Sequence, residues 1–272
     1  MEETITNREA LLEEKKSEDS DLSLTEEEQD EEEQDEELVE IVETEEPVDI
    51  SKTYIYSKQD KLFKPDEFQP KIFVYGIGSL GSHVVMGLAK VGFKDITVYD
   101  FDTVEPSNVP AQFYDITSFG KKTDELKRLV KQMTGIDINI EDVKIDETFQ
   151  PNLSVNSIHM NCVDDMNTFR LIYNKLKGFP IIMFDGRVGG FNYQKYYVNM
   201  MEDNTKYEKT MEGEFSELQC GEKCLWIVNS RLSSLIVTDV IKLSKDKIPS
   251  KTVVGNVMSD ICITDEEEDE DE

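Results

Sequence analysis

Basic residues are scarce in this chain. Its 272 residues include 29 lysines and arginines against 59 aspartates and glutamates, a formal net charge of −30 at pH 7. Proteins that bind the nucleic-acid backbone need clustered positive charge, so we expect no nucleic-acid partner. The acidic excess lies at the two ends: residues 1–50 contain 23 acidic and 3 basic side chains, and residues 265–272 are all acidic. The residues between these ends are close to neutral.

Cysteines and long apolar runs are also few. The four cysteines, Cys162, Cys220, Cys224 and Cys262, are irregularly spaced, which is typical of reduced thiols and indicates a cytoplasmic protein. No apolar run reaches the roughly 20 residues that cross a bilayer, so no membrane-spanning helix is expected. The first residues have neither the positive nor the apolar region of a secretory signal, and we expect none.

Composition divides the chain into three parts. Residues 1–50 and 265–272 are too polar and too uniformly charged to bury a core, which predicts a disordered acidic arm and a disordered acidic tail. These ends either keep the protein soluble or dock a basic partner. Residues 51–264 have the length and apolar content of one globular domain.

A strand, a helix and a second strand open this domain. Residues 71–75 form a short apolar run typical of a buried strand. Residues 79–92 carry apolar side chains at the spacing of one helical face and end in Gly92, a helix stop signal. A second strand is expected at residues 96–99. The pattern predicts a βαβ unit with parallel strands and a right-handed crossover.

Helices and strands alternate along the rest of the domain. The pattern predicts helices at 121–133, 167–177 and 225–243, and strands at 157–162, 180–184 and 193–201, the last of them antiparallel. This alternation favours an α/β fold, a Rossmann-like mixed and largely parallel sheet with helices on both faces.

The turn after the first predicted strand is rich in glycine. Gly76, Gly78 and Gly81 form the pattern Gly-x-Gly-x-x-Gly at the start of the first helix. Glycine lets the backbone approach a phosphate, and the free N–H groups of a helix N-terminus attract its negative charge. The pattern predicts a nucleotide-binding loop; the alternative is a tight turn that needs small residues for packing.

Two carboxylates follow the second predicted strand. Asp100 and Asp102 lie 19 and 21 residues beyond Gly81, where a carboxylate can accept hydrogen bonds from both hydroxyls of a ribose. This arrangement suits NAD and ATP equally, so it does not identify a reaction. For Asp102 the alternative is a turn residue bonded to its own backbone.

Three segments together resemble the ThiF/MoeB-like family, relatives of the ubiquitin-activating enzymes. Asp100–Gln112 is similar to the family's D-x-D…S-N-L-x-R-Q pattern, and Asp165–Arg170 to its D-N-x-x-x-R segment. Residues 184–190, Phe-Asp-Gly-Arg-Val-Gly-Gly, are similar to a D-G-R-x-G-G run in some phage and bacterial members. The resemblance covers about residues 70–245, and the order and spacing of the segments make it specific.

The resemblance implies an ATP- and Mg²⁺-dependent adenylyltransferase that activates the C-terminal carboxylate of a ubiquitin-like or sulfur-carrier protein. It also implies a homodimer, in which the apolar helix 225–243 belongs either to the interface or to the core. The nucleotide-binding residues that it implies are Gly76, Gly78, Gly81, Asp100, Asp102, Asn108 and Gln112.

The resemblance implies that Asp165 binds the metal and is a catalytic residue. An aspartate suits the metal because Mg²⁺ prefers oxygen ligands. The alternative is an N-cap of the helix predicted at 167–177. Asp164 could provide that cap while Asp165 binds the metal.

Two positions depart from the family pattern. Ala111 stands where the family has an arginine before the glutamine, and Thr123 stands where it has a lysine. Lys121 and Lys122 are the lysines nearest to this position, and we choose Lys122 as the candidate for the missing catalytic lysine. The departures favour an alternative, a catalytically degenerate ThiF-like protein that acts as a binding module. A third hypothesis, a nicotinamide-dependent oxidoreductase, fits the glycine pattern but does not need the Asp165 segment.

Cys220 lies 55 residues after Asp165, in a region where some family members carry a catalytic cysteine, and it is a candidate nucleophile. The neighbouring glutamates favour its protonated form and count against this role. A single C-x-x-x-C pair argues against the family's zinc site.

The other candidate side chains have structural interpretations. Cys162 is interpreted as a core residue, and His83 and His159 as isolated residues outside any site. Arg187 either contacts a substrate or nucleotide or pairs with Asp185.

Overall fold

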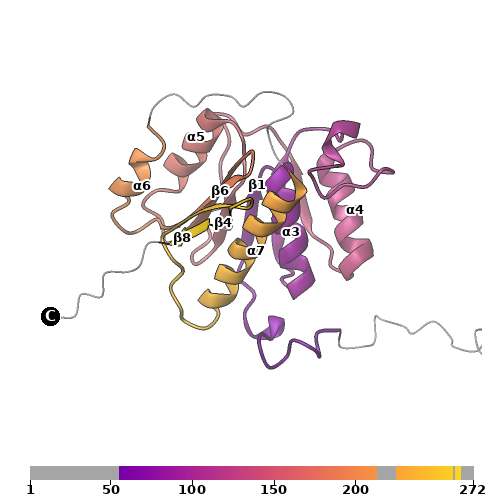
Figure 1. Cartoon of the computed structure of the whole chain (residues 1–272), viewed down its shortest axis with the longest axis horizontal. Helices are drawn as coiled ribbons and strands as arrows, with labels where there is room; N and C mark the ends of the chain where they lie inside the picture. Colours follow the sequence, from indigo (N-terminus) through magenta and orange to yellow (C-terminus); the bar gives the residue numbers. More distant parts are fainter. Residues whose placement is uncertain (1–54, 213–224, 260, 265–272) are drawn as a thin grey trace, which may run out of the picture. The chain divides into compact units, whose positions relative to one another are not determined.

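Among the described residues, eight strands form one mixed sheet in the order β3-β2-β1-β4-β5-β6-β7-β8. Helices pack against this sheet (Figure 1). The structure is a computed structural model that describes residues 55–212, 225–259 and 261–264. The five strands from β3 to β5 run parallel, and β6, β7 and β8 continue the sheet antiparallel. The strands are β1 (Ile72–Tyr75), β2 (Ile96–Asp100), β3 (Asn139–Asp142), β4 (Ile158–Asn161), β5 (Ile182–Gly189), β6 (Asn192–Asn199), β7 (Thr252–Asn256) and β8 (Ile261–Thr264).

Helices cover both faces of this sheet. Side chains of α3 (Ser79–Val91), α4 (Lys122–Thr134) and α7 (Trp226–Leu243) share one core cluster, and those of α5 (Met166–Leu176) and α6 (Thr205–Lys209) share the other. β1 divides its side chains between them, with Ile72 and Val74 in the first cluster and Phe73 and Tyr75 in the second. In the described part of the chain, the 3-10 turn η2 (Pro65–Glu67) precedes β1, and the 3-10 turn η3 (Pro106–Asn108) lies between β2 and α4.

The expected α/β fold is confirmed. The βαβ unit is β1-α3-β2, its strands pair in parallel, and α3 ends at Gly92 with a φ of +107°. The predicted antiparallel strand at 193–201 is β6. Strand β5 differs from the strand predicted at residues 180–184. It begins at Ile182 and continues to Gly189, through most of the family-like motif at residues 184–190.

Helix α7 contributes to the core. Its buried side chains include Leu232, Ile236 and Val240, and a side chain added at Gly87 of α3 would lie 3.1 Å from Val237. One face of α7 is therefore a packing face against α3, and the expected homodimer stays a prediction.

The acidic arm predicted at residues 1–50 and the tail at 265–272 lie outside the described residues. Within the described part of the chain, no helix is both long and apolar enough to span a bilayer.

Candidate functional site

The site lies where the order of the parallel strands reverses, between β1 and β4. The chain leaves β1 into α3 on one side of the sheet and leaves β4 into α5 on the other, and in α/β sheets ligands bind at the carboxyl ends of strands at such a reversal. The glycine loop follows β1 at this point, Asp100 ends β2, and Asp165 begins α5.

Each of the three glycines meets a different surrounding. Gly76 has a φ of +77°, in the left-handed region that favours glycine. A side chain at Gly81 would overlap the carbonyl oxygen of Gly76, so Gly81 lets α3 begin close against the turn. A side chain at Gly78 would meet no atom within 4 Å. Gly76 is therefore required by its backbone conformation and Gly81 by packing, whereas Gly78 borders open space that a ligand can enter.

The N-terminus of α3 is open to an anion. Gly78 is the N-cap residue and supplies no side chain to bond the first N–H groups, and the first turn contains no acidic residue. Such N–H groups carry partial positive charge and bind phosphate. The open space at Gly78 therefore lies beside donors suited to a phosphate group.

Asp100 joins the glycine loop to β2. Its Oδ2 accepts the backbone N–H of Ile77 at 2.8 Å, and its Oδ1 accepts that of Asp102 at 2.8 Å. The side chain of Tyr114 makes a second connection, because its hydroxyl donates to the carbonyl of Ile77 at 2.9 Å. Each carboxylate oxygen of Asp100 thus bonds a backbone donor, an arrangement that sequence reasoning missed and that no pattern around Tyr114 indicated.

Asp102 and Lys122 form an ion pair beside this loop. Lys122 Nζ lies 2.9 Å from Asp102 Oδ2, and the backbone N–H of Lys122 donates to the Asp102 carbonyl at 3.0 Å. The lysine side chain is 8% exposed and the aspartate side chain 46% exposed. The structure therefore brings together the predicted lysine and one of the two predicted ribose carboxylates.

Asn108 and Gln112 differ in what they bond. The side-chain oxygen of Asn108 accepts the backbone N–H of Glu105, which closes the turn η3. Gln112 is buried, and its Oε1 has no hydrogen-bond partner among the described residues. Buried polar atoms are almost always bonded, so this oxygen suits a ligand that donates a hydrogen bond, such as a ribose hydroxyl.

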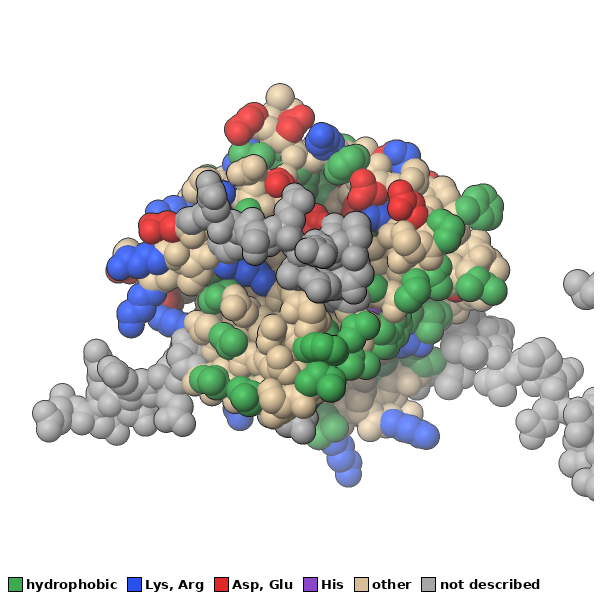
Figure 2. Space-filling model, turned by 45° about the horizontal axis from the view of Figure 1, so that its top comes forward, with side chains coloured by type: hydrophobic (Ala, Val, Ile, Leu, Met, Phe, Trp, Pro, Cys, Tyr) green, Lys and Arg blue, Asp and Glu red, His purple; other side chains and the backbone are tan. Residues whose placement is uncertain are grey.

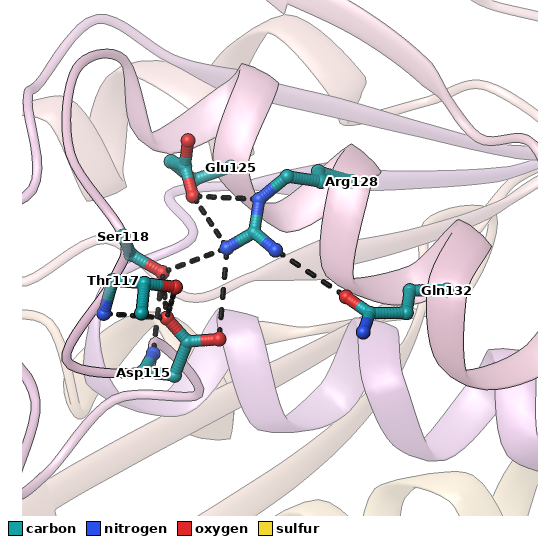
Figure 3. A network of polar contacts seen from close by, with 6 residues as sticks. All are labelled: Asp115, Thr117, Ser118, Glu125, Arg128 and Gln132. Carbon is teal, nitrogen blue, oxygen red and sulfur yellow. Dashed lines mark hydrogen bonds and ion pairs between the residues drawn. The ribbon is translucent and has the colours of Figure 1, made fainter. Parts of the chain in front are cut away.

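Arg128 of α4 fixes the loop that follows Gln112 (Figure 3). Its guanidinium bonds Glu125 Oε2 at 2.8 and 3.0 Å, Gln132 Oε1 at 3.3 Å and Ser118 Oγ at 3.4 Å. Asp115 Oδ2 lies 3.6 Å away. One helix of the domain thereby orders the connection between the Gln112 segment and Lys122.

Ala111, which stands at the family's arginine position, is held through its carbonyl. Asn229 Nδ2 donates to this oxygen at 2.9 Å and His83 Nε2 at 3.2 Å, so α7 and α3 both hold the loop. The ring centroids of His83 and Trp226 lie 4.2 Å apart. Burial lowers the pKa of His83 to about 4, so this histidine is neutral at pH 7. It has a structural role, as the sequence indicated.

Asp165 is exposed and caps α5. Its Oδ2 accepts the backbone N–H of Thr168 at 2.7 Å, and this bond holds the pKa of Asp165 below its usual range. The cap is therefore Asp165 itself and not Asp164. No group of three or more His, Cys, Asp or Glu side chains suited to a metal lies among the described residues. Mg²⁺ bound with a nucleotide needs only one or two carboxylates, so Asp165 remains compatible with it.

Arg187 pairs with Asp185 in a buried cluster. Its Nε and Nη2 lie 2.9 and 2.8 Å from Asp185 Oδ2, and its Nη1 donates to the Thr210 carbonyl at 2.9 Å. The rings of Tyr196 and Phe169 lie 4.8 and 5.0 Å from the guanidinium carbon. Of the two interpretations, the ion pair describes these contacts, and Arg187 connects β5 to the end of α6.

The remaining candidates lie in the core or outside the described residues. Cys162 is half-buried against Gly76 and Gly81, and burial raises the pKa of its thiol. His159 bonds the Tyr75 hydroxyl at 2.7 Å and Ser157 Oγ at 2.8 Å, and burial lowers its pKa to about 3. Cys220 and Cys224 fall in the segment 213–224, outside the described residues, so the nucleophile at Cys220 stays a prediction.

Comparison with known sequences matches residues 55–260 to the model of the ThiF family. The catalytic subunit of the NEDD8-activating enzyme E1 of Caenorhabditis elegans is 29% identical over 130 residues, 45% of this chain and 30% of that protein. SUMO-activating enzyme subunit 2 of Dictyostelium discoideum is 25% identical over 126 residues, 44% of this chain and 19% of that protein. The chain thus spans less than a third of the length of these relatives.

Solved structures share the fold. Escherichia coli MccB crystallised with ATP matches with a TM-score of 0.58 at 16% identity, covering 74% of this chain and 65% of that one. PaaA matches with a TM-score of 0.57 at 15% identity, covering 97% of this chain and 92% of that one. At these identities the likeness supports the fold alone.

Proposed function

The chain belongs to the ThiF family, and from that premise we propose that it binds ATP at the glycine loop and adenylates a C-terminal carboxylate. The observation that carries the proposal is the open space at Gly78, bordered by the uncapped N-terminus of α3. A phosphate placed there meets free N–H groups without a steric clash. Family membership favours ATP over the nicotinamide cofactor of the third hypothesis.

The proposed reaction is a displacement at phosphorus. A carboxylate oxygen of the acceptor attacks the α-phosphorus of ATP, and the bond from that phosphorus to the bridging oxygen of pyrophosphate breaks. The products are an acyl-adenylate and pyrophosphate. The protein contributes by aligning the two reactants and by neutralising the charge that develops on the phosphate oxygens.

Named residues of this chain suit those tasks. Lys122 is an ammonium group held beside the loop by Asp102, where it can stabilise negative charge on a phosphate. Asp100 keeps the loop in shape through Ile77, and Asp102 and the unpartnered oxygen of Gln112 are acceptors for ribose hydroxyls. Asp165 would hold Mg²⁺, which when bound neutralises and orients the phosphates.

The acceptor that we propose is a ubiquitin-like protein, a sulfur-carrier protein or a peptide with a free C-terminus. The matched relatives activate NEDD8 and SUMO by name, and MccB has been crystallised with an ATP analogue and MccA. We extend this substrate class to the present chain, together with a homodimeric state and a cytoplasmic location. If the activated acceptor is transferred from the adenylate to a thiol of this chain, we propose Cys220 as that nucleophile.

Ala111 and Thr123 keep the second hypothesis open, a degenerate nucleotide-binding module. At these positions the chain lacks the two cations of the family pattern, and the Lys122 ammonium is paired with Asp102. Such a module would bind ATP and the partner protein without turnover.

These hypotheses are separated by the exchange of labelled pyrophosphate into ATP. The exchange is measured with peptides that end in a free carboxylate or in a carboxamide. The adenylyltransferase predicts exchange with the free carboxylate alone, and its loss in Asp165→Ala. Asp164→Ala is the matched control, because Asp164 is an exposed neighbour that does not cap α5. ATP binding without exchange for any acceptor would support the binding module, and exchange that persists in Asp165→Ala would refute the metal assignment.

A further inference from the structure

Two buried acceptor oxygens on neighbouring strands have no hydrogen-bond partner among the described residues. They are Oδ1 of Asn161, the last residue of β4, and Oδ1 of Asp185 in β5. Figure 2 shows acidic side chains at the surface, where water can bond their oxygens, but Asn161 and Asp185 are both 0% exposed. Buried polar atoms are almost always bonded, and an unbonded one costs free energy. These two oxygens therefore need a donor that the other described side chains do not supply.

Strand pairing places the two side chains next to each other. Asn161 and Asp185 are register partners in the parallel pair of β4 and β5, so their side chains leave adjacent strands on the same face of the sheet. Adjacent strands lie about 4.8 Å apart, a distance that two such side chains can span. Both oxygens are acceptors, however, so they can bond each other only if one of them carries a proton.

The remaining polar atoms of this pair are already bonded. Asn161 Nδ2 donates to the Phe169 carbonyl of α5 at 3.3 Å, which leaves Oδ1 as the free atom of the amide. Asp185 Oδ2 accepts from Arg187 Nε at 2.9 Å and from the Tyr207 hydroxyl at 3.2 Å. A proton on the carboxyl group therefore belongs on Oδ1, the oxygen without a donor. Its unpartnered acceptor on the neighbouring strand is Asn161 Oδ1.

The groups around Asp185 leave this oxygen to Asn161. The titratable groups that interact with Asp185 are Arg187 of its own strand, Tyr196 of β6, Tyr207 of α6 and Cys162, which follows β4. Burial raises the pKa of both tyrosines and of the cysteine, so Arg187 is the charged member of this set. On β1 and β4, Tyr75 and His159 bond each other at 2.7 Å, and on α5 Arg170 bonds the Met211 carbonyl.

We propose that Asp185 and Asn161 form a proton-dependent hydrogen bond that joins β5 to β4. The proton lies on Asp185 Oδ1 and is donated to Asn161 Oδ1. When the proton leaves, the bond breaks, and two acceptors face each other with a negative charge on one side chain. Because Asn161 also bonds Phe169, the protonated pair connects β5 through β4 to α5. This connection is a pH-sensitive device inside the fold, and it does not depend on the proposed adenylation.

The test measures the pKa of Asp185 in the full chain, by an NMR titration of its carboxyl carbon. Burial raises this pKa to about 6 in the original protein. Asn161→Leu has a side chain of similar size without the acceptor. The pKa of Asp185 should fall in this variant by about half a unit to one unit, because a hydrogen bond donated by the protonated form raises the pKa.

Tyr207→Phe is the matched control on the same carboxyl group. It removes a donor to Asp185 Oδ2, which stabilises the ionised form, so the pKa of Asp185 should rise. A water molecule between the two oxygens predicts the opposite result for Asn161→Leu. Such a water donates to the carboxylate and stabilises its charge, so its loss would raise the pKa of Asp185. An unchanged or raised pKa in Asn161→Leu would overturn the proposal.

The original protein offers a second measurement, which decides the question even if Asn161→Leu does not fold. At about pH 5, one unit below the pKa, Asp185 is mostly protonated. The proposal predicts a carboxyl-proton signal with a nuclear Overhauser effect to the side-chain amide protons of Asn161. The absence of this effect, or an effect from water to the same amide protons in its place, contradicts the proposal.

Discussion

Asp100 Oδ2 accepts the backbone N–H of Ile77 at 2.8 Å, and through this bond the end of β2 sets the shape of the glycine loop. Asp100 is 9% exposed, so water does not replace the bond when it is removed.

Replacing Asp100 therefore tests the loop. Asp100→Ala should lower the free energy of unfolding by about 1–3 kcal/mol, because two backbone donors lose a charged acceptor. The free energy of ATP binding should weaken by more than the free energy of unfolding falls. Asp100→Asn, which keeps one acceptor oxygen and the shape, should lose less of both. Urea denaturation and calorimetric titration with ATP measure the two quantities; unchanged ATP affinity in a folded Asp100→Ala protein would contradict the role.

Lys122 is the cation that the proposal requires. Lys122→Met should lower the pyrophosphate exchange rate by about 100-fold or more, the usual effect of removing one group that stabilises a transition state. Lys121→Met is the control, since Lys121 Nζ contacts the Phe101 carbonyl and the exposed Asp142. It should cost less than tenfold, by the small contribution of surface pairs. Equal losses in both variants would count against Lys122.

Asp185 predicts a specific pH dependence of stability. Burial raises the pKa of Asp185 to about 6, although Arg187 acts in the opposite direction. Its unfolded pKa is about 3.9, so the folded state binds this proton more tightly. Asp185 therefore contributes stability below about pH 4, and this contribution is lost as the pH rises to about 6.

The comparison with Asp185→Asn isolates this contribution. The free energy of unfolding of the original protein, minus that of the variant, should fall by about 2 kcal/mol between pH 4 and pH 6. The comparison is needed because His83 and His159, with lowered pKa values, change stability in the other direction over that range. Parallel curves for the two proteins would show that Asp185 does not titrate there.

The part of the fold nearest the site could be predicted because its signals are local. Residues 72–75 are all buried, so β1 is a continuous apolar run, and Gly92 ends α3 in the left-handed conformation that glycine favours. The outer strands could not be predicted in this way. β3, Asn-Ile-Glu-Asp, is a largely exposed edge strand, and β8 is exposed at every residue, so neither has the burial that creates a pattern.

For the candidate site, the sequence proposes residues but not the bonds between them. The glycine pattern and the pair of carboxylates can be located in the sequence, but the bond from Ile77 to Asp100 depends on how β1 and β2 align. The same limit applies to Arg187, whose partners Asp185 and Thr210 come from β5 and from the residue after α6. Alternation along β5 places Asp185 and Arg187 on one face, and Gly186 between them on the other. A run of residues that resembles a functional motif of a family can thus form a buried structural cluster.

Gly78 gives the most direct test of the central claim that ATP binds at the glycine loop. A methyl group there meets no atom within 4 Å, so Gly78→Ala should fold with a stability within about 1 kcal/mol of the original. Gly81→Ala, which would overlap the Gly76 carbonyl, should lose stability instead. Calorimetric titration of Gly78→Ala with ATP and Mg²⁺, and with NAD as the control ligand, is the decisive measurement. The account predicts that the original protein binds ATP and not NAD, and that Gly78→Ala loses ATP binding while it stays folded; ATP affinity equal to that of the original protein would contradict it.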